Sequence, residues 1–455
     1  MNFITKNRNV LLNILKAAVF GLIFVFAVMP CLRIFGVKHE YIYDTERRIR
    51  EETRNTLDGV YIGSSNAFCF FAPPVLWEEY GYSVILYSIP ALPADSIKYK
   101  LIEARKYQKD ALYIINLNPF KSAGNITNQV IHYLSNYMPL SLNKLQMINS
   151  LSQKRGNDFF SSFEYYFPII RFHSRWTEFV SKEFTRPEIG LKGAIKTGNF
   201  LKKSTDFSDT VFYPDAREPL TDAQLDVLND LLDYIEKENV RVLFVTTPQM
   251  RGDGQQGTFH ALEDYLTERG YDCLPLTGSG ELTGIQADTD YSDHAHTNVH
   301  GALKFTHFLG NYLSEHYDFT DKRNQPGWES WDKSVELFYD IISPWTLDLE
   351  RMHSPRDYSL NAPASLALSG SGTSALLSWK PVEGADGYAV FRKYSSDDGK
   401  NWQWIGDTGS GQTTYSDESL EKGVSYTYTV VPYSLRDGEK YYGKFSYSGV
   451  KAAIK

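Results

Sequence analysis

Apolar and polar positions alternate along residues 58–320 in a pattern that predicts strands and helices in turn. Short runs rich in β-branched and aromatic residues predict buried strands at 60–62, 83–88, 111–117 and 241–248. Apolar residues at helical spacing predict helices at 68–80, 95–108, 220–240 and 258–269. Such alternation predicts an α/β fold with a parallel sheet between two layers of helices, where ligands bind at the carboxyl ends of strands.

Three stretches flank or interrupt this α/β pattern. Residues 39–57 are highly charged, and we interpret them as a stalk or helical lead-in. Residues 120–219 are polar, aromatic and irregular, so they form either an insertion that borders the site or helices packed on the sheet. Residues 321–360 are rich in Trp and contain Pro, which indicates a linker to a last domain at 361–455.

The first 38 residues contain a hydrophobic run, of which 17–32 is the uninterrupted part. This run reaches the length of a membrane span if Lys16 and Arg33 extend their side chains toward the two interfaces. Two basic residues and no acidic residue precede it, which favours a cytoplasmic N-terminus. The sequence therefore predicts an uncleaved transmembrane anchor in the cell membrane, with the α/β and C-terminal domains extracellular.

The chain changes character from about residue 363 onward. Apolar and polar residues alternate in short runs with Gly and Asp between them, which predicts antiparallel strands. Trp379, Tyr388 and Tyr426 stand within or beside these runs. With these three residues, the last part of the chain resembles a fibronectin type III module, which has a core tryptophan and a tyrosine corner. The resemblance implies an all-β sandwich.

Composition narrows the classes of function. The net charge of −8 is spread along the 455 residues and argues against nucleic-acid binding. The three cysteines form no disulfide framework, because Cys31 falls in the hydrophobic run and only Cys69 and Cys273 remain as a pair. We expect two unpaired buried thiols, and no cofactor.

Two short motifs stand at opposite ends of the α/β region. Gly63-Ser64-Ser65 follows the first predicted strand, where a serine can cap a helix or act as a nucleophile. Asp293 and His296 are three residues apart, just before a strongly amphipathic helix, so the carboxylate can contact the imidazole. A serine nucleophile needs such a base and orienting acid, and the two motifs together favour catalysis over capping.

In these motifs the chain resembles the SGNH/GDSL hydrolase family over roughly 58–316, with 120–219 unmatched. The resemblance implies a flavodoxin-like fold, with Ser65 as nucleophile, His296 as general base and acid, and Asp293 as orienting carboxylate. The oxyanion residues of the family are matched only in part. The Ser65 amide and Asn118 are assigned to this role, with Asn118 preferred to Asn116, and no glycine follows the second strand.

The predicted anchor makes the chain similar to two membrane-anchored groups of that clan. These are the D-alanine-transfer protein of teichoic-acid modification and the proteins that O-acetylate polysaccharides such as alginate, which work with a membrane-bound O-acyltransferase. The resemblance implies a serine esterase or O-acyltransferase acting on acyl groups, notably acetyl, of cell-envelope glycans. Hydrolysis and transfer use the same triad, so both stay open.

Two other functions also stay open. A non-catalytic cell-surface binding protein on a degenerate hydrolase scaffold would explain the incomplete oxyanion motif. A metal-dependent deacetylase would use acids and histidines that lie within eleven residues: Asp290, Asp293, His294, His296 and His300. That metal alternative leaves the serine turn unexplained, and we expect His294 and His300 to be structural or solvent-facing.

Overall fold

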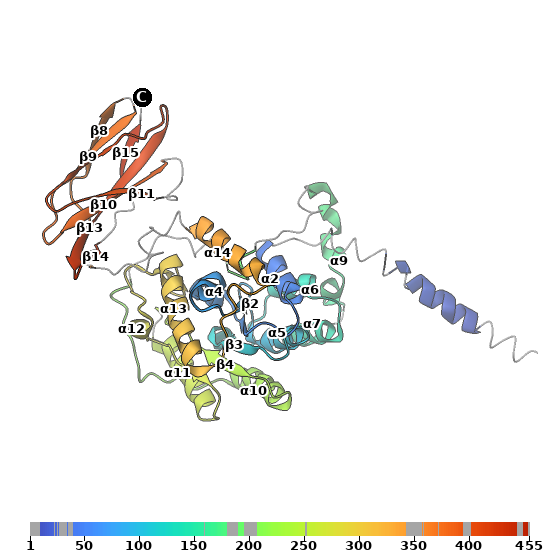
Figure 1. Ribbon diagram of the computed structural model, residues 1–455. Helices are drawn as coiled ribbons and strands as arrows, with labels where there is room; N and C mark the ends of the chain where they lie inside the picture. The colour runs from blue at the N-terminus through green and yellow to red at the C-terminus, as the bar shows by residue number, and fades with distance from the viewer. Residues whose placement is uncertain are drawn as a thin grey trace, which may run out of the picture.

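The computed structural model has two β regions, a five-stranded parallel sheet and a set of antiparallel strands nearer the C-terminus (Figure 1). Most of its helices gather around the parallel sheet, and the helix nearest the N-terminus lies apart from it. The structure describes residues 10–21, 23–24, 26, 34, 40–158, 160–179, 190–194, 207–250, 253–342, 357, 359–371, 373–394, 402–443 and 449–453.

The parallel sheet consists of β1 (Gly59–Ile62), β2 (Val84–Leu86), β3 (Leu112–Asn116), β4 (Val242–Val245) and β5 (Cys273–Leu274). Its strand order is β2-β1-β3-β4-β5, and all neighbours are parallel. This is the order of flavodoxin-like doubly wound sheets, whose direction switches beside the first strand and leaves a ligand crevice there. Every residue of β1 to β4 is buried, as expected for a sheet covered on both faces.

Helices cover both faces of this sheet (Figure 1). On one face α4 (Pro73–Tyr80) contacts α13 (Val299–His316) and α14 (Glu329–Ile342), and α13 also contacts α3 (Ser65–Phe70). On the other face α5 (Ala94–Arg105) contacts α10 (Asp222–Lys237), and α11 (Asp253–Thr267) connects β4 to β5. Right-handed crossovers produce this division. The chain moves from β1 to β2 in one direction along the sheet and from β2 past β1 to β3 in the other, so the connecting helices fall on opposite faces.

The single helix predicted at 68–80 is divided into α3 and α4. Pro73 and Pro74 occupy the first two positions of α4. Proline cannot continue a preceding helix but is well suited to begin one, since the first turn needs no amide donor. The break lets α3 remain a short, almost fully buried helix behind the serine turn.

The charged segment at 39–57, interpreted as a stalk or helical lead-in, contains a helix. Residues Glu40–Glu51 form α2, and its apolar side chains, such as Ile42 and Ile49, are buried with the core of the α/β domain. Its buried Glu46 accepts hydrogen bonds from Lys100 Nζ and from the Tyr87 hydroxyl, both at 2.6 Å. The charges of this segment therefore form internal ion pairs, which a count of charged residues could not distinguish from a solvated surface.

Most described residues of 120–219 are helical. The elements are η1 (Asn118–Ser122), α6 (Asn128–Tyr137), α7 (Leu142–Lys154), α8 (Phe163–Tyr166), α9 (Ile169–Phe172) and η2 (His173–Glu178). Helix α7 packs on α5, where Asn143 Nδ2 donates to the Tyr99 carbonyl at 2.9 Å and Lys154 Nζ lies 2.6 Å from Asp95 Oδ1. These contacts fit the alternative of helices packed on the sheet domain. Residues 180–189 and 195–206 lie outside the described residues.

The first half of the predicted linker at 321–360 belongs to the α/β domain. Helix α14 packs on α4, and Trp77 Nε1 donates to Asp332 Oδ1 at 2.8 Å. The Trp77 ring also packs against Trp328 and Trp331, with centroids 5.4 and 5.3 Å away. Of the tryptophans that marked this stretch in the sequence, Trp331 is therefore a core residue and Trp328 packs partly buried against the core, and 343–356 lies outside the described residues.

The prediction of a transmembrane anchor is wrong. Residues 10–21 are helical, but most of 22–39 lies outside the described residues. Among the helices that the structure describes, none is both long and apolar enough to cross a membrane. The uninterrupted run at 17–32 is itself shorter than the roughly 20 residues of a span, and the prediction depended on two flanking cations to extend it. The single-pass, extracellular placement derived from this anchor is withdrawn with it.

The C-terminal region is all-β, as predicted. Its strands are β8 (Ala367–Ser371), β9 (Ser374–Ser378), β10 (Gly387–Tyr394), β11 (Gln403–Thr408), β12 (Thr414–Asp417), β13 (Ser425–Arg436), β14 (Glu439–Tyr442) and β15 (Val450–Ala453). They form the antiparallel sheets β12-β9-β8 and β11-β10-β13-β14, with β15 also paired to β13. Trp379 and Tyr388 meet edge to face in the core at 5.3 Å, and the Tyr426 hydroxyl accepts the Glu421 amide at 3.2 Å.

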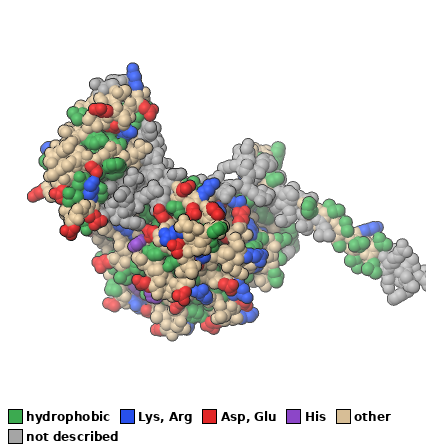
Figure 2. All heavy atoms as spheres, in the orientation of Figure 1, with side chains coloured by type: hydrophobic (Ala, Val, Ile, Leu, Met, Phe, Trp, Pro, Cys, Tyr) green, Lys and Arg blue, Asp and Glu red, His purple; other side chains and the backbone are tan. Residues whose placement is uncertain are grey.

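Acidic and basic side chains are interspersed over the face of the molecule in Figure 2. No patch of a single sign dominates this face, in keeping with a net charge spread along the chain. Histidines are visible over α13, whose His307 and His316 are exposed. The surface on this side is therefore of mixed charge.

Candidate active site

The serine turn is held by close packing around Gly63. Strand β1 ends at Ile62, and Gly63-Ser64 lead directly into α3, whose first residue is Ser65. A Cβ atom on Gly63 would lie 2.7 Å from Ala67 Cβ and 2.8 Å from Asn116 Cβ. A larger residue would push the turn away from its neighbours, so glycine is needed here for close approach. Ser65 thus stands, partly exposed, at the carboxyl end of a central strand.

The acid and the imidazole lie on a small hairpin. Strands β6 (Tyr291–Asp293) and β7 (His296–Thr297) pair antiparallel, and Ser292 Oγ donates across them to the His296 carbonyl at 3.1 Å. Helix α13 begins directly after Asn298. The Asn298 side chain acts as its N-cap and accepts from the backbone amides of His300 and Gly301. The turn between the strands brings the side chains of Asp293 and His296 to the same side.

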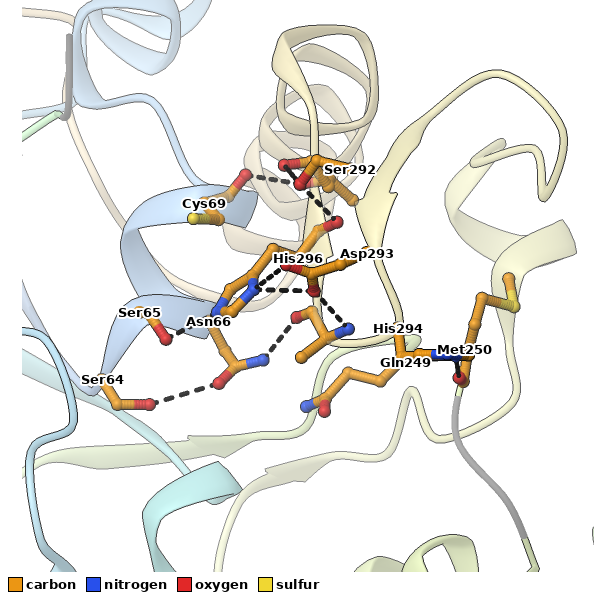
Figure 3. Close-up of polar contacts among 12 residues, drawn as sticks. Ser64, Ser65, Asn66, Cys69, Gln249, Met250, Ser292, Asp293, His294 and His296 are labelled. Carbon is orange, nitrogen blue, oxygen red and sulfur yellow. Dashed lines mark hydrogen bonds and ion pairs between the residues drawn. The ribbon is translucent and has the colours of Figure 1, made fainter. Parts of the chain in front are cut away.

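The two motifs meet in space (Figure 3). His296 Nε2 lies 2.7 Å from Ser65 Oγ, and His296 Nδ1 lies 2.8 and 2.9 Å from the two Asp293 oxygens. A carboxylate only accepts hydrogen bonds, so Nδ1 carries the proton and the Nε2 lone pair faces the Ser65 hydroxyl. In this arrangement the imidazole can take the proton of the serine. The structure therefore brings together all three residues that the sequence predicts as catalytic.

Asp293 is kept in its ionised form by its neighbours. Burial by itself raises the pKa of Asp293, but the hydrogen bonds from His296 and from the Ala295 amide, with the charge of the imidazole, outweigh it and hold the pKa below its usual value. The carboxylate is 37% exposed and the imidazole 18%, so both are reachable from solvent. An ionised Asp293 fixes the imidazole tautomer and would stabilise an imidazolium if the proton of Ser65 passed to Nε2.

Helix α3 is tied to the hairpin at both of its ends. Asn66 Nδ2 donates to the Ala295 carbonyl at 2.6 Å, and Thr297 Oγ1 donates to the Cys69 carbonyl (Figure 3). Cys69 itself is buried, and burial raises the pKa of its thiol well above the usual value. Cys69 and Cys273 are both free thiols, with Cys69 buried and Cys273 only partly so.

Asn118, predicted to stabilise the oxyanion, lies beside the serine turn. Its Nδ2 donates to Asn66 Oδ1 and lies 3.4 Å from Ser64 Oγ. Asn116 is instead fully buried. Its side-chain Nδ2 lies 3.4 Å from the Tyr61 hydroxyl, and its Oδ1 accepts from the backbone amide of Asn118 at 3.0 Å. Both asparagines therefore adjoin the serine turn: Asn116 packs against Gly63, and the Asn118 side chain reaches Ser64 and Asn66.

Two residues of this site were missed in the sequence. Asn66 follows Ser65 directly and links α3 to the hairpin, as described above. Gln249 lies on the loop after β4, and its Nε2 donates to Asn118 Oδ1 at 2.7 Å. The signal for Gln249 was its position just past the carboxyl end of a predicted buried strand, the edge at which such sheets bind ligands.

The acids and histidines of the metal alternative do not converge. Asp290 is ion-paired with Lys304 at 2.7 Å, and His294 Nδ1 faces the Met250 carbonyl at 3.0 Å. His300 is buried in the first turn of α13. Within the described part of the chain, no three His, Cys, Asp or Glu side chains are arranged to hold a metal ion. Neighbouring residues of the hairpin point to opposite sides, which separates side chains that are close in sequence.

The last described part of 120–219 reaches this hairpin. The Phe207 amide donates to the Ala287 carbonyl at 2.9 Å, and the Phe207 ring packs on His294 with centroids 4.6 Å apart. The Phe207 ring also contacts Tyr291 edge to face. One end of 120–219 therefore borders the candidate site, while the helices at 128–178 pack elsewhere on the domain.

Comparisons with known proteins match only a small part of the chain. No protein-family model and no curated protein matches the chain. Similar solved structures include the fibronectin type III domain of human collagen XX (22% identity, TM-score 0.17), which covers 20% of this chain and 94% of that one. For a redesigned β-sandwich protein (18% identity, TM-score 0.18), the match covers 21% of this chain and 90% of that protein. For a β-1,2-glucanase from Parabacteroides distasonis (21% identity, TM-score 0.18), the match covers 22% of this chain and 14% of the glucanase.

The C-terminal region is fibronectin type III-like. This statement rests on its two antiparallel sheets and on the burial of Trp379 and Tyr388 between them. The likenesses to solved structures cover about a fifth of the chain, and at these TM-scores they add no argument about activity. The function of the fibronectin type III-like region is therefore left out of the proposal below.

Proposed function

We propose that the chain is a serine ester hydrolase or acyltransferase of the SGNH/GDSL type that works through an acyl-enzyme. One observation carries the proposal: Ser65, His296 and Asp293 form a continuous hydrogen-bonded chain at the carboxyl edge of the parallel sheet. The strand order and the glycine-enforced turn before Ser65 support it, because they hold the hydroxyl at the edge where doubly wound sheets bind ligands.

The geometry supports the following steps. Ser65 Oγ attacks the acyl carbon of the ester while its proton passes to His296 Nε2, which lies 2.7 Å away. The tetrahedral intermediate collapses, the bond to the alcohol breaks, and the leaving alkoxide takes the proton from His296. Water or the hydroxyl of an acceptor alcohol then attacks the acyl carbon and gives its proton to His296. The bond from that carbon to Ser65 Oγ breaks, His296 returns the proton to Ser65 Oγ, and the acyl group leaves as an acid or as the new ester.

The negative charge that develops on the acyl oxygen needs hydrogen-bond donors. The amide of Ser65 at the start of α3 and the Asn118 side chain are the proposed donors. The contact between Asn118 Nδ2 and Ser64 Oγ is 3.4 Å, longer than a good hydrogen bond, so this amide proton is the one that a substrate oxygen can recruit.

The proposal names an ester and not a particular glycan. An acylated cell-envelope glycan and a membrane-bound O-acyltransferase partner were expected from the predicted anchor, and that anchor is contradicted. Hydrolysis and transfer both follow from the same three residues, since they differ only in the nucleophile that attacks the acyl-enzyme.

A fluorophosphonate probe tests the proposal directly, because it phosphonylates an activated serine. The full chain is treated with the probe, and the modified residue is located by mass spectrometry. We expect labelling at Ser65 in the wild type and none in Ser65→Ala or His296→Ala. Ser83→Ala serves as the control, since Ser83 is a buried serine at the opposite, amino edge of the sheet.

Labelling of the control at the wild-type rate is the expected result. A folded wild-type protein without labelled Ser65 would overturn the proposal and favour the non-catalytic binding protein. Labelling of Ser65 that persists in His296→Ala would show a reactive hydroxyl that does not depend on the imidazole, which the proposed mechanism forbids.

A further inference from the structure

A chain of three side-chain amides connects four separate segments around Ser65. Gln249 Nε2, on the loop after β4, donates to Asn118 Oδ1 at 2.7 Å. Asn118 Nδ2, after β3, donates to Asn66 Oδ1. Asn66 Nδ2, in α3, donates to the Ala295 carbonyl at 2.6 Å, between Asp293 and His296. The chain therefore runs from β4 to the acid–imidazole hairpin.

The direction of every amide in this chain is determined from its end. A backbone carbonyl only accepts, so Asn66 must turn its Nδ2 toward Ala295 and its Oδ1 toward Asn118. Asn118 must then present its Nδ2 to Asn66, which leaves its Oδ1 facing Gln249. Gln249 must therefore direct its Nε2 toward Asn118 Oδ1. Reversing any one of the three side-chain amides would place two acceptors or two donors against each other.

Burial makes such a reversal costly. Asn66 is 1% exposed and Gln249 4%, so neither can exchange its partner for bulk water. Gln249 is also held from its other side, since its Nε2 lies 3.1 Å from Thr247 Oγ1 and its backbone amide donates to the Thr247 carbonyl at 2.8 Å. An unsatisfied buried donor or acceptor costs about 1–3 kcal/mol, enough to keep the chain in one direction.

We propose that Gln249 is a positioning residue for the reaction, acting through Asn118. By donating to Asn118 Oδ1, it adds a second restraint to the one from Asn66, and together they keep the Asn118 Nδ2 group turned toward the serine turn, where the oxyanion forms. Gln249 does not touch the reacting atoms. The inference rests on the proposed function, and it adds a requirement that the triad alone does not contain.

Gln249→Glu and Gln249→Met test this role in the full chain with p-nitrophenyl acetate as substrate. Glutamate has the same shape but presents an acceptor, which favours the reversed Asn118 amide. Methionine fills similar space without a donor, so the Asn118 Oδ1 loses its hydrogen bond but the Asn118 amide is not driven to reverse. We expect kcat to fall in the order wild type, Met, Glu, by roughly 10–100-fold for Glu, which is less than the about 10²–10³-fold for losing an oxyanion donor outright.

KM should change less than about threefold in both variants, because the oxyanion contact strengthens only in the transition state. Gln108→Glu is the matched control. Gln108 is also fully buried, and its side chain bonds the Thr56 and Leu57 amides and the Thr53 carbonyl at the amino edge of the sheet. We expect this control to lower the melting temperature and to leave kcat unchanged.

The two proposals fail in different ways. If wild-type Ser65 is not labelled by the fluorophosphonate, both the proposed function and the role of Gln249 are wrong. If wild-type Ser65 is labelled, and kcat in both Gln249 variants stays at the wild-type value or falls only in step with the melting temperature, as in Gln108→Glu, the role of Gln249 alone is wrong. Because Gln249→Met introduces no charge, it keeps the test decisive even if Gln249→Glu does not fold.

Discussion

Asp293 in the α/β domain and Asp417 in the C-terminal sandwich are similar carboxylates in different surroundings. Asp417 accepts from Arg392 Nη1 at 2.8 Å and from the Tyr428 hydroxyl at 2.9 Å. Burial raises the pKa of Asp417, but hydrogen bonds from Ser419 and Tyr428 and the charge of Arg392 hold it below its usual value. Both carboxylates are therefore kept ionised by hydrogen bonds that outweigh burial.

The difference lies in what each partner can pass on. His296 has a second nitrogen, and that nitrogen faces Ser65 Oγ. Arg392 cannot be deprotonated in a protein, and burial raises the pKa of the Tyr428 hydroxyl, so neither partner of Asp417 can relay a proton near neutral pH. A lowered carboxylate pKa is therefore common to both regions, and what sets Asp293 apart is the imidazole that connects it to the hydroxyl of Ser65.

The largest expected effect separates the two carboxylates by activity. Asp293→Asn should lower kcat for ester hydrolysis by roughly 10²–10⁴-fold, because the imidazole loses its orienting charge and its tautomer. Steady-state kinetics with p-nitrophenyl acetate measure the change, and circular dichroism checks the fold. Asp417→Asn should leave kcat at the wild-type value. Equal kcat values in the two variants would contradict the comparison.

The next effect concerns how tightly each region packs around a glycine. Gly63→Ala should destabilise the α/β domain by about 1–3 kcal/mol, since the new Cβ would lie 2.7 Å from Ala67 Cβ. It should also shift Ser65 and slow fluorophosphonate labelling. Gly409→Ala is the control in the sandwich, because a Cβ atom added there would have no neighbouring atom within 4 Å. Thermal unfolding measures the stability of both variants. A melting temperature of Gly63→Ala equal to that of the wild type would mean that the turn is not close-packed.

A third effect is on stability alone. Asp417→Asn should destabilise the sandwich by about 1–3 kcal/mol, because Arg392 and Tyr428 lose a charged acceptor. Urea unfolding of the full chain followed by tryptophan fluorescence measures it, since buried tryptophans report on both regions, Trp77 in the α/β domain and Trp379 in the sandwich. The same unfolding curve for Asp293→Asn should stay close to that of the wild type, since Asp293 is 37% exposed. A larger loss for Asp293→Asn would reverse the roles assigned to the two carboxylates.

The smallest effect depends on pH. Hydrogen bonds from Ser359 outweigh slight burial and, with those from Ser434 and Arg436, lower the pKa of Asp357 to about 2. An unfolded aspartate has a pKa of about 3.9, so the unfolded state binds more protons between these values. The stability that Asp357 contributes is therefore complete above about pH 4 and is lost as the pH falls toward 2.

The melting temperature of Asp357→Asn should accordingly be below that of the wild type at pH 6, and the gap should close on acidification toward pH 2. Melting curves at several pH values measure it. A gap that stays constant with pH would mean that Asp357 acts through packing and not through its charge.

Much of the fold could be predicted from the sequence, because the strands of the sheet are buried on both faces and read as short apolar runs. The order of strands and helices, the serine turn and the Asp293–His296 pair were all identified by spacing within short segments. The long helix at 68–80 was predicted without its break, although the two prolines that cause it are in plain view.

Composition left three segments incompletely assigned. The charged residues of 40–51, the tryptophans of 328–331 and the apolar run at 17–32 were interpreted from composition, which does not say what a segment packs against. In the structure α2 and α14 are parts of the α/β domain, and no described helix has the length and apolarity of a membrane span. Burial depends on distant partners, such as Lys100 for Glu46 and Trp77 for Trp331.

The sequence by itself determined which residues carry the candidate chemistry, since Ser65 lies in one local motif and Asp293 with His296 in another. Only the tertiary structure decided that they meet, because Ser65 and His296 are 231 positions apart and their contact depends on how α3 packs on the hairpin. It also decided the direction of the amides of Asn66, Asn118 and Gln249. An amide is symmetric in shape, so its orientation follows only from the donors and acceptors that folding places around it.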